Sequence, residues 1–142
     1  MHCLSRFTGL LFLACAFLPA DAAEPVKVGV VGMDNYQAVA YAQLLNSPKA
    51  EGDLAGAKVV AAFPGEPSPH IAESAVNLPK WVAQIQKFDV KIVETMDDVL
   101  KQVDAVMIMS LDPRVHVEQA RAVLKAKKPL YIGRPMAMSL TD

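Results

Sequence analysis

Five short apolar segments, rich in valine and isoleucine, recur along this chain of 142 residues. Apolar runs of this length are typical of strands that are buried on both faces of a sheet. The stretches between them have helical character, and alternating strands and helices form the repeating unit of parallel sheets. We therefore predict an α/β fold with a doubly wound, Rossmann-like parallel sheet in the strand order 3-2-1-4-5. The predicted strands cover residues 25–31, 58–63, 90–93, 105–109 and 129–132.

The segments between these strands contain recognisable helix signals. In the first, Val39, Ala42 and Leu45 recur at three-residue steps, which predicts a helix over residues 36–45. Three later helices are predicted to begin at residues 77–79 (Asn-Leu-Pro), 95–98 (Thr-Met-Asp-Asp, similar to a capping box) and 112–113 (Asp-Pro).

The first 22 residues have the pattern of a secretory signal peptide. Arg6 is the only charged residue before Asp21, and the apolar stretch 7–18 between them is too short to cross a bilayer as a helix. The residues up to Ala22 follow the small-x-small pattern of a cleavage site. We expect a signal peptide over residues 1–22 and a mature domain over residues 23–142, in the periplasm or outside the cell.

Three alternatives to this processing stay open. Cleavage after Ala23 is the next best position, and the leader could instead remain as an uncleaved membrane anchor. A lipoprotein is the third alternative, because the segment that ends at Cys15 loosely resembles a lipobox.

Composition excludes several kinds of site from the mature domain. Both cysteines, Cys3 and Cys15, lie in the leader, so disulfides, thiolate metal sites and a cysteine nucleophile are excluded. The net charge of −1, with both signs scattered, argues against a nucleic-acid or anionic-membrane surface. The sequence shows no metal-ligand spacing, and it leaves open whether the domain forms a homo-oligomer.

Three stretches of the sequence resemble the N-terminal domain of the glucose–fructose oxidoreductase / inositol dehydrogenase (Gfo/Idh/MocA) family. They are 27–32 (Lys-Val-Gly-Val-Val-Gly), 104–110 together with His116, and 129–137 around Gly-Arg-Pro. This resemblance implies an NAD(P)-binding domain of an oxidoreductase that acts on sugars, cyclitols or similar polyols. It also implies a second, mostly β domain that holds the substrate. We expect this second domain to be missing from the chain, and we therefore expect the chain to be inactive alone.

The resemblance places the cofactor near the turn that follows the first strand, where the family has a glycine-rich fingerprint. Gly29 and Gly32 are candidate cofactor-binding residues there, but the later glycines of the fingerprint are replaced, one of them by Asp34. Asp34 and Asn35 are further candidate cofactor-binding residues in this turn. The Asp34 carboxylate would lie beside the pyrophosphate, or else Asp34 or Asn35 caps the following helix. The acidic residue expected after the second strand is also missing, with Glu66 as a displaced substitute.

Further candidates follow the fourth and fifth strands. The resemblance places Ser110 and Pro135 near the cofactor, and it gives His116 and Arg134 catalytic roles close to the nicotinamide. Arg134 stands where the family has a lysine, and an arginine binds anions but makes a poor acid or base. Alternatively, His116 is a packed or capping residue without a catalytic role, and Arg134 is a solvent-exposed residue at the end of a strand. Pro135 is a candidate for a cis peptide bond, as in the family.

We therefore predict an exported NAD(P)-binding domain of an oxidoreductase-like protein. The rival interpretations are a degenerate, non-catalytic domain that binds a small ligand or partner, and a truncated reading frame.

Overall fold

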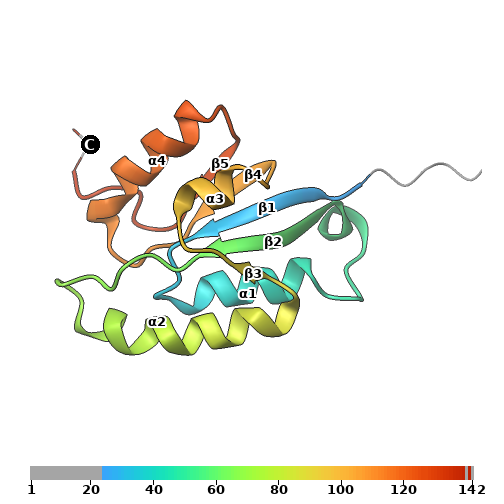
Figure 1. The fold of residues 1–142 in the computed structure, drawn as a ribbon, viewed down its shortest axis with the longest axis horizontal. Helices are drawn as coiled ribbons and strands as arrows, with labels where there is room; N and C mark the ends of the chain where they lie inside the picture. The colour runs from blue at the N-terminus through green and yellow to red at the C-terminus, as the bar shows by residue number, and fades with distance from the viewer. Residues whose placement is uncertain (1–23, 140, 142) are drawn as a thin grey trace, which may run out of the picture.

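A five-stranded parallel sheet forms the centre of the computed structural model, which describes residues 24–139 and 141. Its strand order is β3-β2-β1-β4-β5, which confirms the predicted fold class and topology (Figure 1). The predicted signal peptide lies outside the described residues. The strands are β1 (Val26–Val31), β2 (Ala57–Phe63), β3 (Lys91–Ile92), β4 (Ala105–Ile108) and β5 (Leu130–Ile132). The helices are α1 (Tyr36–Leu45), α2 (Ala72–Ile85), α3 (Met96–Leu100) and α4 (His116–Lys125), with short 3₁₀ turns η1 (Gly52–Gly56), η2 (Gln86–Phe88) and η3 (Pro113–Val115).

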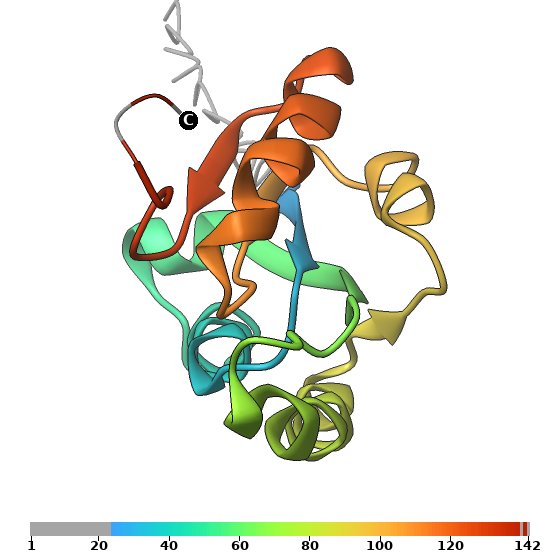
Figure 2. The same ribbon diagram turned by 90° about the vertical axis from the view of Figure 1, so that its left-hand side faces the viewer.

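Helices cover both faces of the sheet, with α1 and α2 on one side and α3 and α4 on the other (Figures 1 and 2). Two apolar clusters match these two layers. On the first side, Val28 and Val30 of β1 pack with Val39 of α1. On the other side, Val31 packs with Val99 of α3. Side chains of β1 therefore contribute to both apolar clusters, as expected for a strand buried on both faces.

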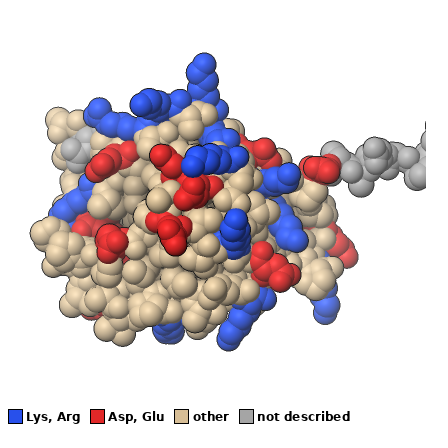
Figure 3. All heavy atoms as spheres, in the orientation of Figure 1, with Lys and Arg blue, Asp and Glu red and all other residues tan. Residues whose placement is uncertain are grey.

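The outer surface over α3 and α4 is charged. Acidic and basic side chains are interspersed there, with a row of basic ones along the upper edge of the view (Figure 3). These helices bury their apolar faces against the sheet and leave their polar faces in water. Within the described residues, no helix is both long and apolar enough to cross a membrane.

Local signals set several helix ends where they were predicted. The Asn35 side chain accepts a hydrogen bond from the backbone N–H of Gln37 and caps α1. Thr95 caps α3 by accepting from Asp98 N at 3.2 Å. Asp112 caps η3, which leads directly into α4. These caps need only neighbouring residues, so the sequence predicts them well.

The start of α2 was predicted wrongly. The helix begins at Ala72 rather than at residues 77–79, and Pro79 lies inside it. A tertiary contact explains the earlier start of the helix. Ser74, in the first turn of α2, is fully buried and hydrogen-bonded to Asp34. A contact to a residue 40 positions away leaves no local sequence signal.

Candidate functional site

The carboxyl ends of β1, β2 and β4 meet at one end of the sheet, and Figure 2 looks onto this end. A cleft of about 530 Å³ opens there, within the range of small-molecule sites. It lies beside the point where strand order reverses, which is where open parallel sheets bind ligands. Its lining comes from the turn after β1, the loop after β2 and the segment after β4, and comprises Asp34, residues 63–70, Ser110, Asp112, Arg114, Val115, Glu118 and Gln119.

The turn after β1 requires glycine at position 32. Gly32 has a φ of +83°, in the left-handed region that favours glycine. A Cβ added to it would lie 2.1 Å from Ser110 Oγ and 2.4 Å from Ser110 N. The glycine therefore lets the turn after β1 lie directly against the segment after β4, which brings the predicted site residues Gly32 and Ser110 together.

Asp34 is buried, with 4% of its surface exposed, and its carboxylate is anchored by two hydrogen bonds. Oδ1 accepts from the backbone N–H of Leu111 and Oδ2 accepts from Ser74 Oγ, both at 2.7 Å. Both carboxylate oxygens therefore have protein partners. Asp34 joins the turn after β1 to α2 and to the segment after β4, and it does not cap α1.

Asn35 is the residue that caps α1, and it has a second role. Its Nδ2 donates to the backbone carbonyl of Met109, at the end of β4. The backbone N–H groups of Gly32 and Met33 donate to Phe63 O (2.9 Å) and Pro64 O (3.0 Å), so the loop after β2 is fixed to this turn. Among the described residues, the N–H of Tyr36 at the start of α1 has no acceptor and remains available to an anion.

The proline-rich loop after β2 is held by serine hydroxyls. Ser68 N donates to Ser74 Oγ at 2.8 Å, and Ser68 Oγ donates to Asp112 Oδ2 at 2.5 Å. Because Ser74 also donates to Asp34, one polar network connects all three segments that line the cleft. No pattern in the sequence indicates this network, because serines occur in loops for many different reasons.

Asp112 is buried next to the exposed Arg114, with Oδ2 of the carboxylate 3.0 Å from Nη1 of the guanidinium. Burial by itself raises the pKa of the Asp112 carboxyl. The hydrogen bonds from Ser68 and from the backbone and side chain of Arg114 outweigh burial and hold the pKa below its usual value. The carboxylate therefore stays ionised at neutral pH, and its negative charge balances the positive charge of Arg114.

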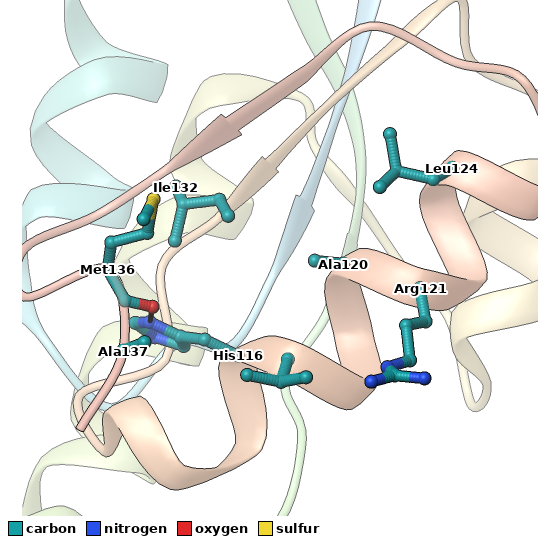
Figure 4. A pocket seen from close by; sticks show the side chains of 8 residues that line it. His116, Ala120, Arg121, Leu124, Ile132, Met136 and Ala137 are labelled. Atoms are coloured by element: carbon teal, nitrogen blue, oxygen red, sulfur yellow. Dashed lines mark hydrogen bonds between the residues drawn. The ribbon is translucent and has the colours of Figure 1, made fainter. Parts of the chain in front are cut away.

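His116 joins the segments that follow β4 and β5. It is 1% exposed, and its Nε2 lies 2.8 Å from Ser110 O. Its Nδ1 lies 3.1 Å from the backbone oxygen of Met136 (Figure 4). A neutral imidazole donates to one of these carbonyls, whereas an imidazolium donates to both. Both ring nitrogens therefore lie against backbone carbonyls in this arrangement, and neither is exposed.

A second, mostly apolar hollow of about 190 Å³ lies between α4 and the segment after β5, with His116 in its lining (Figure 4). Ala120, Leu124, Ile132 and Met136 line it. It contains few polar groups that could orient a ligand, and it shares no lining residue with the cleft.

Arg134 and Pro135 are exposed just beyond β5, outside the lining of the cleft. The bond between them is cis, as the resemblance suggested. Arg134 lies close enough to Tyr41 to influence its ionisation. The pKa of Tyr41 is nevertheless raised, mainly because its hydroxyl shares a hydrogen bond with that of Tyr131, 3.3 Å away.

Gly29 was expected to line the turn that binds the cofactor, but it does not lie in that turn. It lies in the middle of β1, and a Cβ there would come within 2.3 Å of Val99 Cγ1 and 3.2 Å of Val103 Cγ1. Its missing side chain lets α3 pack closely on the sheet. Gly29 therefore supports the fold, while Gly32 shapes the site.

Within residues 24–139 and 141, no group of three or more His, Cys, Asp or Glu side chains is arranged to hold a metal ion. The chemistry available at the cleft is that of hydrogen bonds, a helix N-terminus and fixed carboxylates.

Comparisons with solved structures show the same fold. The UDP-N-acetylglucosamine 3-dehydrogenase GnnA from Acidithiobacillus ferrooxidans matches with a TM-score of 0.60 at 16% identity, over 82% of this chain and 32% of that one. KijD10, a 3-ketoreductase from Actinomadura kijaniata crystallised with NADP, matches with a TM-score of 0.52 at 21% identity, over 80% and 31%. The WlbA dehydrogenase from Bordetella pertussis, crystallised with NADH and UDP-GlcNAcA, matches with a TM-score of 0.54 at 17% identity, over 84% and 30%.

This chain thus spans about a third of the length of those proteins. None of the curated proteins matches its sequence significantly. The model of the oxidoreductase family with an NAD-binding Rossmann fold, named GFO_IDH_MocA, matches residues 26–142. The chain therefore belongs to the Gfo/Idh/MocA oxidoreductase family, and the matched residues are its NAD-binding Rossmann domain.

Proposed function

We propose that the cleft binds a nicotinamide dinucleotide, NAD or NADP, in an exported oxidoreductase that acts on a sugar or polyol. The observation that carries the proposal is the close approach of Gly32 to Ser110 beside the N-terminus of α1. It packs the segment after β4 against the turn after β1, beside a helix N-terminus of the kind that attracts anions.

The residues present fit such a group in three respects. The N–H of Tyr36, two residues beyond Asp34 of the cleft lining, has no acceptor among the described residues, and the cleft volume of about 530 Å³ is large enough for a nucleotide. The Asp34 carboxylate, which could have repelled a pyrophosphate, is instead bonded to Leu111 and Ser74. When bound, the nicotinamide would supply the hydride chemistry of the family.

This chain's own residues would have three tasks. The N-terminus of α1 would bind the pyrophosphate, and Ser110 with Gln119 would border the cofactor from the β4 side, where their side chains are 2.9 Å apart. His116 would hold Ser110 and Met136 in place. Arg134, exposed beyond β5, would meet an anionic or hydroxylated group of the substrate. GnnA, a UDP-N-acetylglucosamine 3-dehydrogenase, and WlbA, crystallised with UDP-GlcNAcA, support a sugar-like substrate.

Equilibrium binding tests this function. We expect the purified chain to bind NADH or NADPH at micromolar to submillimolar concentration in titration calorimetry. Replacement of Tyr36 by proline removes the N–H while its fixed φ remains suited to the first position of a helix. The Tyr36→Pro variant should bind at least fivefold more weakly, whereas Tyr36→Phe, which keeps the N–H, should bind like the parent. Equal affinities of the parent and Tyr36→Pro would contradict the placement of the pyrophosphate.

Export is a separate part of the proposal, motivated by the charge and apolar pattern of residues 1–22. We expect protein recovered from its native host to begin at Ala23. N-terminal sequencing measures this directly. A soluble cytoplasmic protein that keeps Met1 would overturn it.

A further inference from the structure

Two of the three tyrosines of this chain meet, although they lie 90 positions apart in the sequence. Tyr41 belongs to α1 and Tyr131 to β5, and their rings are in edge contact, with centroids 5.9 Å apart and an interplanar angle of 67°. Their hydroxyl oxygens lie 3.3 Å apart and share a hydrogen bond. The phenol ends of the two side chains, which carry their redox chemistry, are therefore neighbours.

The pair is accessible from solvent. Tyr131 is 45% exposed and Tyr41 is half-buried, and neither residue lines the cleft. The shared hydrogen bond is the main reason why the pKa of Tyr41 is raised, so Tyr41 is a neutral phenol at neutral pH. A one-electron oxidant can reach this pair, and a proton that is released on oxidation can pass to water.

The chemistry of phenols decides what oxidation of such a pair produces. Loss of one electron and one proton from a tyrosine leaves a phenoxyl radical, whose unpaired electron is shared between the oxygen and the ortho and para carbons of the ring. The para carbon of tyrosine carries the rest of the side chain, so two such radicals join through their ortho carbons. After tautomerisation the product is dityrosine, in which one carbon–carbon bond has replaced one C–H bond of each ring.

We propose that Tyr41 and Tyr131 form an oxidative modification site, at which an intramolecular dityrosine bond joins α1 to β5. The oxidant is a peroxide that acts through a peroxidase. One molecule of hydrogen peroxide takes two electrons and two protons from the pair and is reduced to two molecules of water. The described residues contain no cysteine, so a disulfide cannot supply a covalent cross-link among them.

Treatment of the full chain, at low protein concentration, with a haem peroxidase and hydrogen peroxide tests the proposal. We expect dityrosine fluorescence in protein that stays monomeric on a denaturing gel. Tandem mass spectrometry of a digest should find the peptides of Tyr41 and Tyr131 joined at these two residues, with the loss of one hydrogen atom from each. Tyr41→Phe and Tyr131→Phe should each abolish the fluorescence of the monomer, because phenylalanine forms no phenoxyl radical.

Tyr36 supplies the matched control, since it is the remaining tyrosine and lies on the same helix as Tyr41. It is 61% exposed, and among the described residues it makes no ring contact and no hydroxyl hydrogen bond. Tyr36→Phe should therefore leave the fluorescence of the monomer as it is in the parent.

Three results would overturn the proposal. The first is fluorescence of the monomer that persists in Tyr41→Phe or in Tyr131→Phe. The second is dityrosine that occurs only in covalent dimers, which would place the reacting side chains on different molecules. The third is a monomer whose cross-linked peptides contain Tyr36, because exposure rather than the contact between α1 and β5 would then decide which residues react.

Discussion

Replacement of Gly32 by alanine is expected to lower the free energy of unfolding by about 2–6 kcal/mol. Two costs combine at this position. The φ of +83° is strained for a residue with a Cβ, at about 1–3 kcal/mol. The new methyl group would also overlap the backbone of Ser110, which cannot rotate away as a side chain can, and overpacking adds about 1–3 kcal/mol. The loss is comparable to the whole stability of a small domain.

Alanine variants at two other glycines separate the cost of backbone strain from the cost of steric overlap. Gly52 has a φ of +57° with nothing within 4 Å of an added Cβ, so Gly52→Ala should show the backbone strain alone. Gly56 has open space and no such φ, so Gly56→Ala should change stability by less than about 0.5 kcal/mol. Urea unfolding of the three variants gives the comparison. A cost for Gly32→Ala no greater than that for Gly52→Ala would show that the turn does not touch Ser110 as described.

Replacement of Asp34 by alanine is expected to destabilise the protein by about 2–4 kcal/mol. The change removes the acceptor of two 2.7 Å hydrogen bonds, from Leu111 N and Ser74 Oγ. Hydrogen bonds to a charged group contribute about 1.5–3 kcal/mol each, and donors left buried without a partner add a penalty. Relief from burying the carboxylate offsets part of this loss.

Urea unfolding measures the effect of Asp34→Ala, and hydrogen exchange at the Leu111 amide locates it. Exchange there should accelerate more than exchange in β1. Asp34→Asn, which keeps one acceptor oxygen, should cost about half as much. The control is Asp53→Ala, since Asp53 is exposed and should change stability by less than about 0.5 kcal/mol. If Asp34→Ala were as stable as the parent, the carboxylate would have to point into the cleft instead.

The sequence predicted those parts of the fold that depend on local patterns. Helix α1 matches its predicted range because Asn35 caps it and the apolar spacing continues to Leu45. The strand order followed from the alternation of strands and helices, because right-handed crossovers between them give a doubly wound sheet. The start of α2 could not be predicted, because Ser74 is held by Asp34 from a distant part of the chain.

The sequence predicted where the candidate site lies better than it predicted what the individual residues contact there. Gly32 and Ser110 do meet at the switch in strand order. Sequence spacing alone could not show that Gly29 faces Val99, nor that both ring nitrogens of His116 bond to backbone carbonyls. Nor could it show that a proline-rich loop is anchored by Ser68 to Asp112. In each case the deciding partner is distant in sequence or belongs to the backbone.

The central claim is that a nicotinamide dinucleotide binds where the turn after β1 faces the segment after β4. Titration of the ¹⁵N-labelled chain with NADH, followed by two-dimensional NMR, tests this claim residue by residue. We expect the largest amide shifts at Gly32, Tyr36, Gly65 and Ser110, whereas the amides of Gly52 and Gly56, at the other end of the sheet, should not shift. Shifts confined to the hollow around Ala120 and Leu124, or no shifts at millimolar NADH, would contradict it.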